Sequence, residues 1–351
     1  MSPMPKRLFF FEQWMDSAGP EIAARNSDIE LIQMDQTDDE VKIWSALASA
    51  HGYQLRPSTE TKKQFWPGRE LLERCPNLLA VSSAGAGYDI VDVDACNDAG
   101  VLVVNQSGSN SESVAQHVIG MTLALAKQII QSDRAIRHEA RDWTRWDFCG
   151  HELTGRTIGI VGLGNIGRRV ARLAKAFNMT VMAYDPYITD DDFRERGAAR
   201  MASLSDLFAA ADIVSVNCPL TNETRGMVGA ELYALLKPSS LFITTARGFI
   251  HDEAALTAAI AEGRIAGAGC DVFCEEPPAH DHPLMAFDNV IVSPHIAGIT
   301  DDANYNMASY AADQWGDILS GRRPPRLKNP EAWDRYCRRF ADMFGVEPVA
   351  A

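Results

Sequence analysis

Three polar residues in the second half of the sequence have the side chains needed for proton transfer and anion binding. Arg247 follows the apolar run 240–245, His295 ends the apolar run 289–293, and Glu276 lies between them. A histidine can donate or accept a proton near neutral pH, and a neighbouring carboxylate favours its imidazolium form. A guanidinium fork can hold a carboxylate in two hydrogen bonds and polarise a carbonyl. These residue types suit acid/base chemistry on a small organic anion.

Each of these residues also has a structural interpretation that sequence spacing does not exclude. Arg247 could be a surface residue of a turn, and His295 could be a hydrogen-bonded structural histidine, a role that histidine also fills. Spacing alone does not place Glu276 beside His295. The choice between these interpretations depends on the elements that would position the three side chains.

Those elements are organised around a Gly-x-Gly-x-x-Gly run that follows an apolar strand. Gly162 would make a tight turn, Gly164 would let a pyrophosphate approach the backbone, and Gly167 would let helix and strand pack closely. Apolar residues at helical spacing come next, so the motif has its required strand, turn and helix. The amide groups of Asn165 and Ile166 at the helix start would then bind phosphates.

A single carboxylate predicts which dinucleotide binds. Asp185 ends the apolar run 180–184, about 20 residues after the glycines, where a ribose-binding acid is expected. It would repel a 2′-phosphate, and Pro186 and Tyr187 follow it instead of an arginine. The sequence therefore predicts NAD rather than NADP. The alternative is an ordinary glycine turn in which Asp185 caps a loop.

Composition limits the possible partners. The 351 residues, of which 46% are apolar, allow two packed cores, and the net charge of −14 disfavours nucleic acid or an anionic membrane. The seven cysteines form no Cys-x-x-Cys pair, so neither a metal site nor a disulfide framework is indicated, and we expect a cytoplasmic protein. The apolar run near the N-terminus is too short for a signal peptide or membrane span.

Apolar runs alternate with helical patterns both before residue 109 and after residue 157, which predicts an α/β protein with two doubly wound parallel sheets. Between them, a helical pattern runs from about Ser111 to about Glu139, with an apolar face that includes Val118. Two open α/β units would place a ligand cleft between them. Residues 336–351 show no assignable pattern and are predicted to be a C-terminal tail.

The sequence resembles the D-isomer specific 2-hydroxyacid dehydrogenase family, which includes phosphoglycerate, glycerate and formate dehydrogenases. Its landmarks occur in the family's order between about residues 7 and 320. They are the glycine run and the segments 85–89, 110–115, 217–221, 246–248, 271–277 and 294–298. The resemblance implies a flavodoxin-like substrate domain (1–109 and 299–335) and a Rossmann NAD-binding domain (110–298).

The resemblance also implies an activity, the NAD-dependent interconversion of a small D-2-hydroxy acid and its 2-keto acid. Arg247 would bind the substrate carboxylate and carbonyl, His295 would be the acid/base, and Glu276 would hold His295. Formate dehydrogenases have Gln at the position of Glu276, so the glutamate favours keto acid reduction.

Further contacts are carried over from the family position by position. Asp271 would meet the nicotinamide carboxamide, and the cofactor would also be lined by Cys218, Pro219, Thr224 and Ala246. The implied substrate contacts are Ala86, Gly87, Asn110 and Arg56. Arg56 lies where phosphoglycerate dehydrogenases carry a substrate-side arginine, although Pro57 and the long stretch 62–68 depart from their pattern.

Two expectations concern the protein as a whole. The resemblance and the long apolar helix after residue 110 predict a homodimer, because so large an apolar face would otherwise be exposed. The alternative to an enzyme is an NAD(H)-sensing binding protein, like the transcriptional corepressors that resemble this family and can keep the same Arg, Glu and His. Turnover with a keto acid would distinguish the two.

Overall fold

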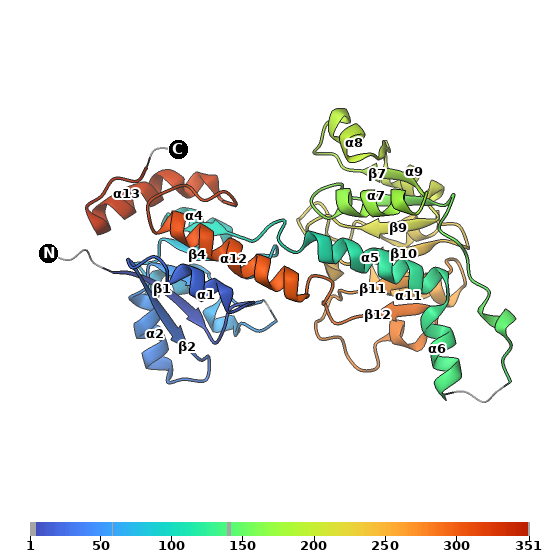
Figure 1. Cartoon of the computed structure of the whole chain (residues 1–351), viewed down its shortest axis with the longest axis horizontal. Coiled ribbons are helices and arrows are strands. Elements are labelled where there is room, and N and C mark those ends of the chain that lie inside the picture. Colours follow the sequence, from blue (N-terminus) through green and yellow to red (C-terminus); the bar gives the residue numbers. More distant parts are fainter. Residues whose placement is uncertain (1–4, 58, 139–141, 350–351) are drawn as a thin grey trace. The chain divides into compact units, whose positions relative to one another are not determined.

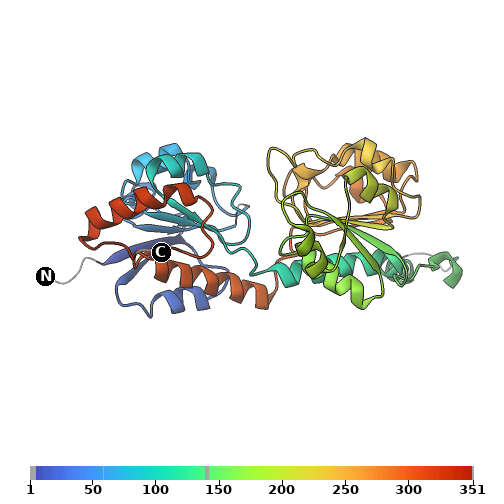
Figure 2. The same ribbon diagram turned by 90° about the horizontal axis from the view of Figure 1, so that it is seen from above.

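The protein is described by a computed structural model that covers residues 5–57, 59–138 and 142–349. Its contacts divide the chain into two compact units (Figure 1). Unit 1 comprises Met1–Asn110 and Ile299–Ala351, and unit 2 comprises Ser111–Gly298. Each unit has its own parallel sheet with helices on both faces, as Figure 2 shows from above.

Unit 1 contains a five-stranded parallel sheet in the order β2-β1-β3-β4-β5. The strands are β1 (Lys6–Phe11), β2 (Ile29–Met34), β3 (Gly52–Gln54), β4 (Ala80–Ser82) and β5 (Leu102–Val104). One face is covered by α2 (Glu40–Ala48), α3 (Arg69–Arg74) and α4 (Val93–Ala99), and the other by α1 (Ala18–Ala23), α12 (Asp301–Ile318) and α13 (Trp333–Phe344). Phe9 and Phe10 of β1 enter opposite cores, which explains why this strand is a continuous apolar run.

Unit 2 contains a seven-stranded parallel sheet in the order β12-β11-β10-β9-β6-β7-β8. Its strands are β6 (Thr157–Val161), β7 (Thr180–Tyr184), β8 (Ala199–Arg200), β9 (Ile213–Val216), β10 (Leu241–Thr244), β11 (Gly267–Cys270) and β12 (Val290–Val292). One face packs on α5 (Ser111–Ala126), α7 (Gly167–Ala176) and α8 (Asp190–Arg196). The other packs on α9 (Leu204–Ala210), α10 (Ala230–Tyr233) and α11 (Glu253–Ala261).

The two strand orders are those of doubly wound folds. Unit 1 has the flavodoxin-like order 2-1-3-4-5, and unit 2 has the dinucleotide-binding order, with β6 as its first strand. The predicted class of two doubly wound parallel sheets is confirmed.

The long helix predicted after residue 110 is two helices. α5 ends at Ala126, and α6 (Ile129–His138) begins after Gln128, whose φ of 52° is left-handed. A non-glycine residue in this conformation interrupts the helix, and side-chain periodicity does not reveal it. The predicted end near Glu139 lies outside the described residues.

The predicted C-terminal tail is also different in the structure. Residues 333–344 form α13, in which Tyr336 and Phe340 are buried at 0% and 1% exposure in a core of unit 1. Aromatic residues at a spacing of four do indicate a helical face, but the polar residues between them conceal it. The short elements α1, α4, α8 and β8 were likewise not predicted, because two to seven residues carry little periodicity.

Candidate active site

The glycine turn after β6 has the shape that the fingerprint requires. Gly162 has a φ of 87°, and a Cβ there would lie 2.9 Å from the backbone nitrogen of Cys218. A Cβ at Gly167 would collide with the carbonyl oxygen of Gly162, whereas one at Gly164 would meet nothing within 4 Å. The turn is therefore tight at its first and third glycines and open at the second, which fits an approaching pyrophosphate.

The start of α7 is also suited to a phosphate group. Its N-cap residue, Ile166, offers no side-chain hydrogen bond to the first amide groups of the helix. Amide groups at a helix start attract anions, and the positive end of the helix dipole strengthens this attraction.

Asp185 lies beside this turn, directly after β7. Its carboxylate accepts hydrogen bonds from the amides of Leu163 at 2.9 Å and Tyr187 at 3.0 Å. These bonds fix the carboxylate next to the glycine run, where a ribose hydroxyl would need an acceptor.

The loop after β9 forms another wall of this region. The Thr224 hydroxyl donates to the Pro219 carbonyl at 2.7 Å and so closes the turn. Burial raises the pKa of the Cys218 thiol to about 11, which keeps it protonated and excludes it as a nucleophile. Ala246, which follows β10, is 8% exposed.

The structure brings His295 and Glu276 together. His295 Nδ1 lies 2.7 Å from Glu276 Oε2, and Glu276 Oε1 accepts from the Phe273 amide at 3.1 Å. Burial raises the pKa of Glu276, but the bond and charge of His295, the Phe273 amide and the charge of Arg247 outweigh it and leave that pKa below its ordinary value. Glu276 is therefore an ionised carboxylate held against the ring of His295.

Arg247 belongs to the same group of residues. It follows β10 in an extended conformation, and its NH1 donates to the Ala246 carbonyl at 2.7 Å. Its charge lowers the pKa of Glu276. A guanidinium, an imidazole and a carboxylate thus lie near the carboxyl ends of β10, β11 and β12, the end of such sheets where ligands bind.

Asp271 is fully buried and holds the turn that presents His295. Its oxygens accept from the Ser293 hydroxyl at 2.5 Å and from the Ile296 and Ala297 amides at 2.9 Å each. His295 has a φ of 57°, a left-handed conformation that needs such support. The predicted contact of Asp271 with a nicotinamide carboxamide stays a prediction.

His117 of α5 extends this network and was not predicted from the sequence. Its Nε2 lies 3.1 Å from the Ser293 hydroxyl. The single proton of Ser293 is directed at Asp271, so the hydroxyl accepts from His117. This is the reverse of a base-activated serine, and the three residues support the His295 turn instead of forming a nucleophile. The sequence feature that could have pointed to this network is Ser293, which lies two residues before His295.

The predicted substrate residues of unit 1 lie on three loops. The Asn105 side-chain amide donates to the Ala86 carbonyl at 2.6 Å, and the Ser83 hydroxyl donates to the Gly87 carbonyl. Asn110 is half-exposed just before α5. Arg56 forms ion pairs with Glu12 at 3.4 Å and with Glu60, so its guanidinium is shared between two carboxylates.

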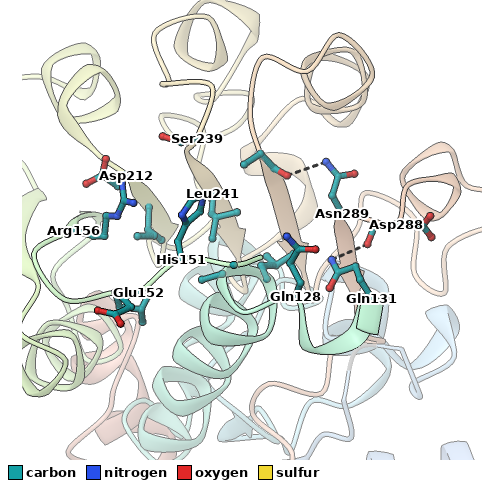
Figure 3. Close-up of a pocket in the computed structure, with 16 residues that line it drawn as sticks. Gln128, Gln131, His151, Glu152, Arg156, Asp212, Ser239, Leu241, Asp288 and Asn289 are labelled. Atoms are coloured by element: carbon teal, nitrogen blue, oxygen red, sulfur yellow. Dashed lines mark hydrogen bonds between the residues drawn. The ribbon is translucent and has the colours of Figure 1, made fainter. Parts of the chain in front are cut away.

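A cavity of about 350 Å³ lies at the amino ends of the strands of the unit 2 sheet, away from the carboxyl ends that carry Arg247 and His295 (Figure 3). It is lined by the residues that precede several strands, including Arg156, Asp212 and Asn289, together with Gln131 of α6. None of the predicted site residues lines it. Two bonds within its wall, from Asn289 to the Ala266 carbonyl and from Gln131 to the Asp288 carbonyl, are drawn in Figure 3.

Two searches of the described residues were negative. No group of three or more His, Cys, Asp or Glu in that part of the chain could hold a metal ion. Among the same residues, no helix has the length and apolar character needed to cross a membrane.

Comparisons with known proteins show the family of the chain. The family profile described as "D-isomer specific 2-hydroxyacid dehydrogenase, NAD binding domain" matches residues 119–297. D-3-phosphoglycerate dehydrogenase from Archaeoglobus fulgidus is 38% identical over 252 residues, which are 72% of this chain and 47% of that protein. The chain spans about half the length of the phosphoglycerate dehydrogenases that it matches.

Two further proteins are similar over most of their own length. (S)-Sulfolactate dehydrogenase from Chromohalobacter salexigens is 38% identical over 277 residues, which are 79% of this chain and 87% of that protein. D-Lactate dehydrogenase from Aquifex aeolicus, solved with NAD and lactic acid, is 27% identical with a TM-score of 0.77, covering 92% of this chain and 99% of that one. The predicted family and the predicted cofactor, NAD, are confirmed: the chain belongs to the D-isomer specific 2-hydroxyacid dehydrogenase family.

Proposed function

We propose that this protein is an NAD-dependent dehydrogenase that interconverts a small D-2-hydroxy acid and its 2-keto acid. The observation that carries the proposal is the 2.7 Å contact of His295 with an ionised Glu276, with Arg247 close enough to lower the pKa of that glutamate. An acid/base pair beside a cation is what reduction of an anionic carbonyl compound requires.

Each of the three side chains has a distinct role in this proposal. The glycine turn would hold NADH, which when bound would provide a hydride. Because Glu276 occupies Nδ1 of His295, the other ring nitrogen, Nε2, exchanges a proton with the substrate oxygen. Arg247 binds the substrate carboxylate and stabilises the negative charge that develops on the carbonyl oxygen. For unit 1, we assign the backbone of Ala86 and Gly87, with Asn110, to the substrate carboxylate.

The test is NADH oxidation by the purified protein with a panel of 2-keto acids. The panel comprises glyoxylate, hydroxypyruvate, pyruvate, phenylpyruvate and one phosphorylated and one sulfonated member, and His295→Ala serves as the control. We expect turnover with at least one keto acid. If the protein bound NADH but turned over none of these keto acids, the result would favour the alternative of an NAD(H)-sensing binding protein. No observation on this chain supports that alternative.

We also propose a homodimer, but on a different surface from the one the sequence suggested. Val118, Ile119 and the other core residues of α5 are buried within unit 2, and no large apolar side chain of that helix is exposed. Instead, Ile129 and Ile136 of α6 are 51% and 69% exposed, and Trp146 of the short helix η2 (Arg145–Phe148) is 71% exposed. Figure 1 shows α6 extending beyond the sheet of unit 2.

This surface gives the dimer a direct test. We expect sedimentation of the wild-type protein to show a dimer and Ile136→Lys to weaken it, because a charge replaces an exposed apolar side chain. A wild-type monomer at micromolar concentration would contradict the proposal.

We also propose a cytoplasmic location, because all seven cysteines are free thiols.

A further inference from the structure

A second glutamate, Glu253, contacts the loop that carries Glu276. This loop connects β11 to the short helix η4 (Pro283–Ala286). While one oxygen of Glu276 contacts His295, its other oxygen accepts from the Phe273 amide. The position of the proton-transfer pair therefore depends on where the backbone at residues 273 and 274 lies.

Glu253 binds the next amide along this backbone. It is the first residue of α11, and its Oε1 accepts from the Cys274 amide at 2.7 Å. Consecutive amides, those of Phe273 and Cys274, thus donate to two different glutamates. Burial and the Glu253 carboxylate raise the pKa of the Cys274 thiol to about 12, so the thiol stays protonated and can donate as well.

The other oxygen of Glu253 reaches the far end of the same loop. Its Oε2 lies 3.5 Å from His282 Nε2, and both side chains are largely buried, at 18% and 15% exposure. One carboxylate therefore links the beginning and the end of the loop on which Glu276 lies. The start of a helix favours this negative charge.

The same backbone also touches the segment that carries the arginine. Gly248, next to Arg247, packs so closely that a Cβ there would collide with the Phe273 carbonyl group. The backbone at Phe273 and Cys274 is thus packed between the Arg247 turn on one side and Glu253 on the other.

We propose that Glu253 is a positioning residue for the proton-transfer pair, acting through the Cys274 amide and His282. The inference rests on the proposed function, because it assigns Glu276 and His295 to proton transfer. Without the Glu253 carboxylate, the loop loses its link to α11 and Glu276 is held less firmly against His295. A misplacement of about 1 Å in such a pair can cost up to about a hundredfold in turnover.

The variants Glu253→Ala and Glu253→Gln test the proposal together. Glu253→Ala removes every contact, whereas Glu253→Gln keeps an oxygen that can accept from the Cys274 amide and loses only the charge. We expect kcat for keto acid reduction to fall roughly tenfold to a hundredfold in Glu253→Ala and less in Glu253→Gln. The KM for NADH should stay within about twofold, since the glycine turn is not part of this loop.

A matched control lies at the other end of the same helix. Glu262, the C-cap residue of α11, pairs only with Arg264 among the described residues, and Glu262→Gln should behave as wild type. Melting temperatures of all variants show whether each one folds. If Glu253→Ala does not fold, Glu253→Gln still carries the test.

Two measurements separate a positioning role from a merely structural one. In the Glu253 variants the basic limb of the profile of kcat for reduction against pH should move to lower pH, because a less firmly held Glu276 carboxylate favours the imidazolium of His295 less. The NMR titration of His295, assigned with His295→Ala, should move in the same direction and needs no turnover. Unchanged profiles and an unchanged His295 titration in a folded Glu253→Ala would overturn the proposal. If the wild type turned over no keto acid but the His295 titration still moved, the proposed function would fail and the positioning role would stand.

Discussion

The two units share one architecture but differ in what lies at the carboxyl ends of their strands. In unit 1 the charged residues there, Arg56 and Glu12, pair with each other, and the buried ones are neutral amides. Gln54 accepts from Trp315 at 2.8 Å, and Gln106 accepts from Gln314 at 2.9 Å. In unit 2 the residues at this end include the ionisable groups Arg247 and His295. Unit 1 thus fixes its loops with a buried network of amides, and unit 2 presents charges.

This difference separates support from chemistry. Buried amides whose partners are all present make loops rigid without contributing charge. A reaction that moves a hydride and a proton needs charged groups, which unit 2 supplies. Changes in unit 2 should therefore alter turnover and pH dependence, whereas changes in unit 1 should alter substrate affinity.

The largest effect expected is in unit 2, from His295→Ala. Loss of an acid/base typically costs 10²–10⁴-fold in turnover, so we expect kcat to fall by about that factor. The affinity for NADH, measured by fluorescence titration, should be preserved because the proposed phosphate and ribose contacts lie at the glycine turn and Asp185. Near-normal turnover would remove His295 from the mechanism.

A smaller effect in unit 2 concerns the choice of cofactor. Two like charges about 4 Å apart repel by about 1 to 4 kcal/mol near a protein surface, so Asp185→Asn should improve kcat/KM for NADPH by roughly tenfold or more. Wild type should prefer NADH strongly. Equal use of both cofactors by the unmodified protein would contradict the role given to Asp185.

In unit 1, the corresponding change is Asn105→Ala, which removes the bond to the Ala86 carbonyl. A neutral hydrogen bond contributes about 1 kcal/mol, so the KM for the keto acid should rise about fivefold with little change in kcat. Asn77→Ala is the control, because Asn77 makes the same kind of bond to the Ala48 carbonyl on the surface of the same unit. If kcat fell by a larger factor than the KM rose, the proposed difference between the two units would be wrong.

The last expected effect is on stability instead of turnover, and in it the two units behave alike. Burial lowers the pKa of His51 in unit 1 to about 4, with Arg7 and Lys6 adding to the shift, and burial lowers that of His251 in unit 2 to about 4. Between the ordinary value of 6.5 and about 4 the unfolded chain binds protons that the folded chain does not, so stability falls as pH falls.

This acid sensitivity can be divided between the two histidines. Each contributes about 1.4 kcal/mol per pH unit in that window. Neither ring nitrogen of His251 has a hydrogen-bond partner among the described residues, so His251→Leu should flatten the pH dependence of urea unfolding without harming stability at pH 7. His51 accepts from the Arg7 amide at 2.8 Å, so His51→Leu should cost stability at pH 7. Identical behaviour of the two variants would contradict this assignment.

The sequence allowed the fold class to be predicted because both sheets are buried on both faces and their strands are plain apolar runs. It did not allow the break at Gln128 to be predicted, because a left-handed φ has no side-chain signal. The helix Trp333–Phe344 was missed because its aromatic face is hidden among charged residues.

The site was predictable to the extent that its residues are charged and follow strands. Arg247 and His295 met this condition, whereas Glu276, six residues beyond the end of β11, was proposed only through the family resemblance. His117 and Glu253 did not, because each acts on a segment distant in sequence and is recognised only by its contacts. Residues that support a site through long-range hydrogen bonds have no local pattern by which to predict them.

The central claim is that Glu276 and His295 work as one proton-transfer pair, and Glu276→Gln tests it most directly. Glutamine keeps the size of the side chain and removes the charge that favours the imidazolium, whereas the wild-type carboxylate stays ionised because its pKa lies below its ordinary value. The measurement is kcat for keto acid reduction and for hydroxy acid oxidation as a function of pH. We predict that the basic limb of reduction and the acidic limb of oxidation both move to lower pH, and unchanged profiles in both directions would contradict the account.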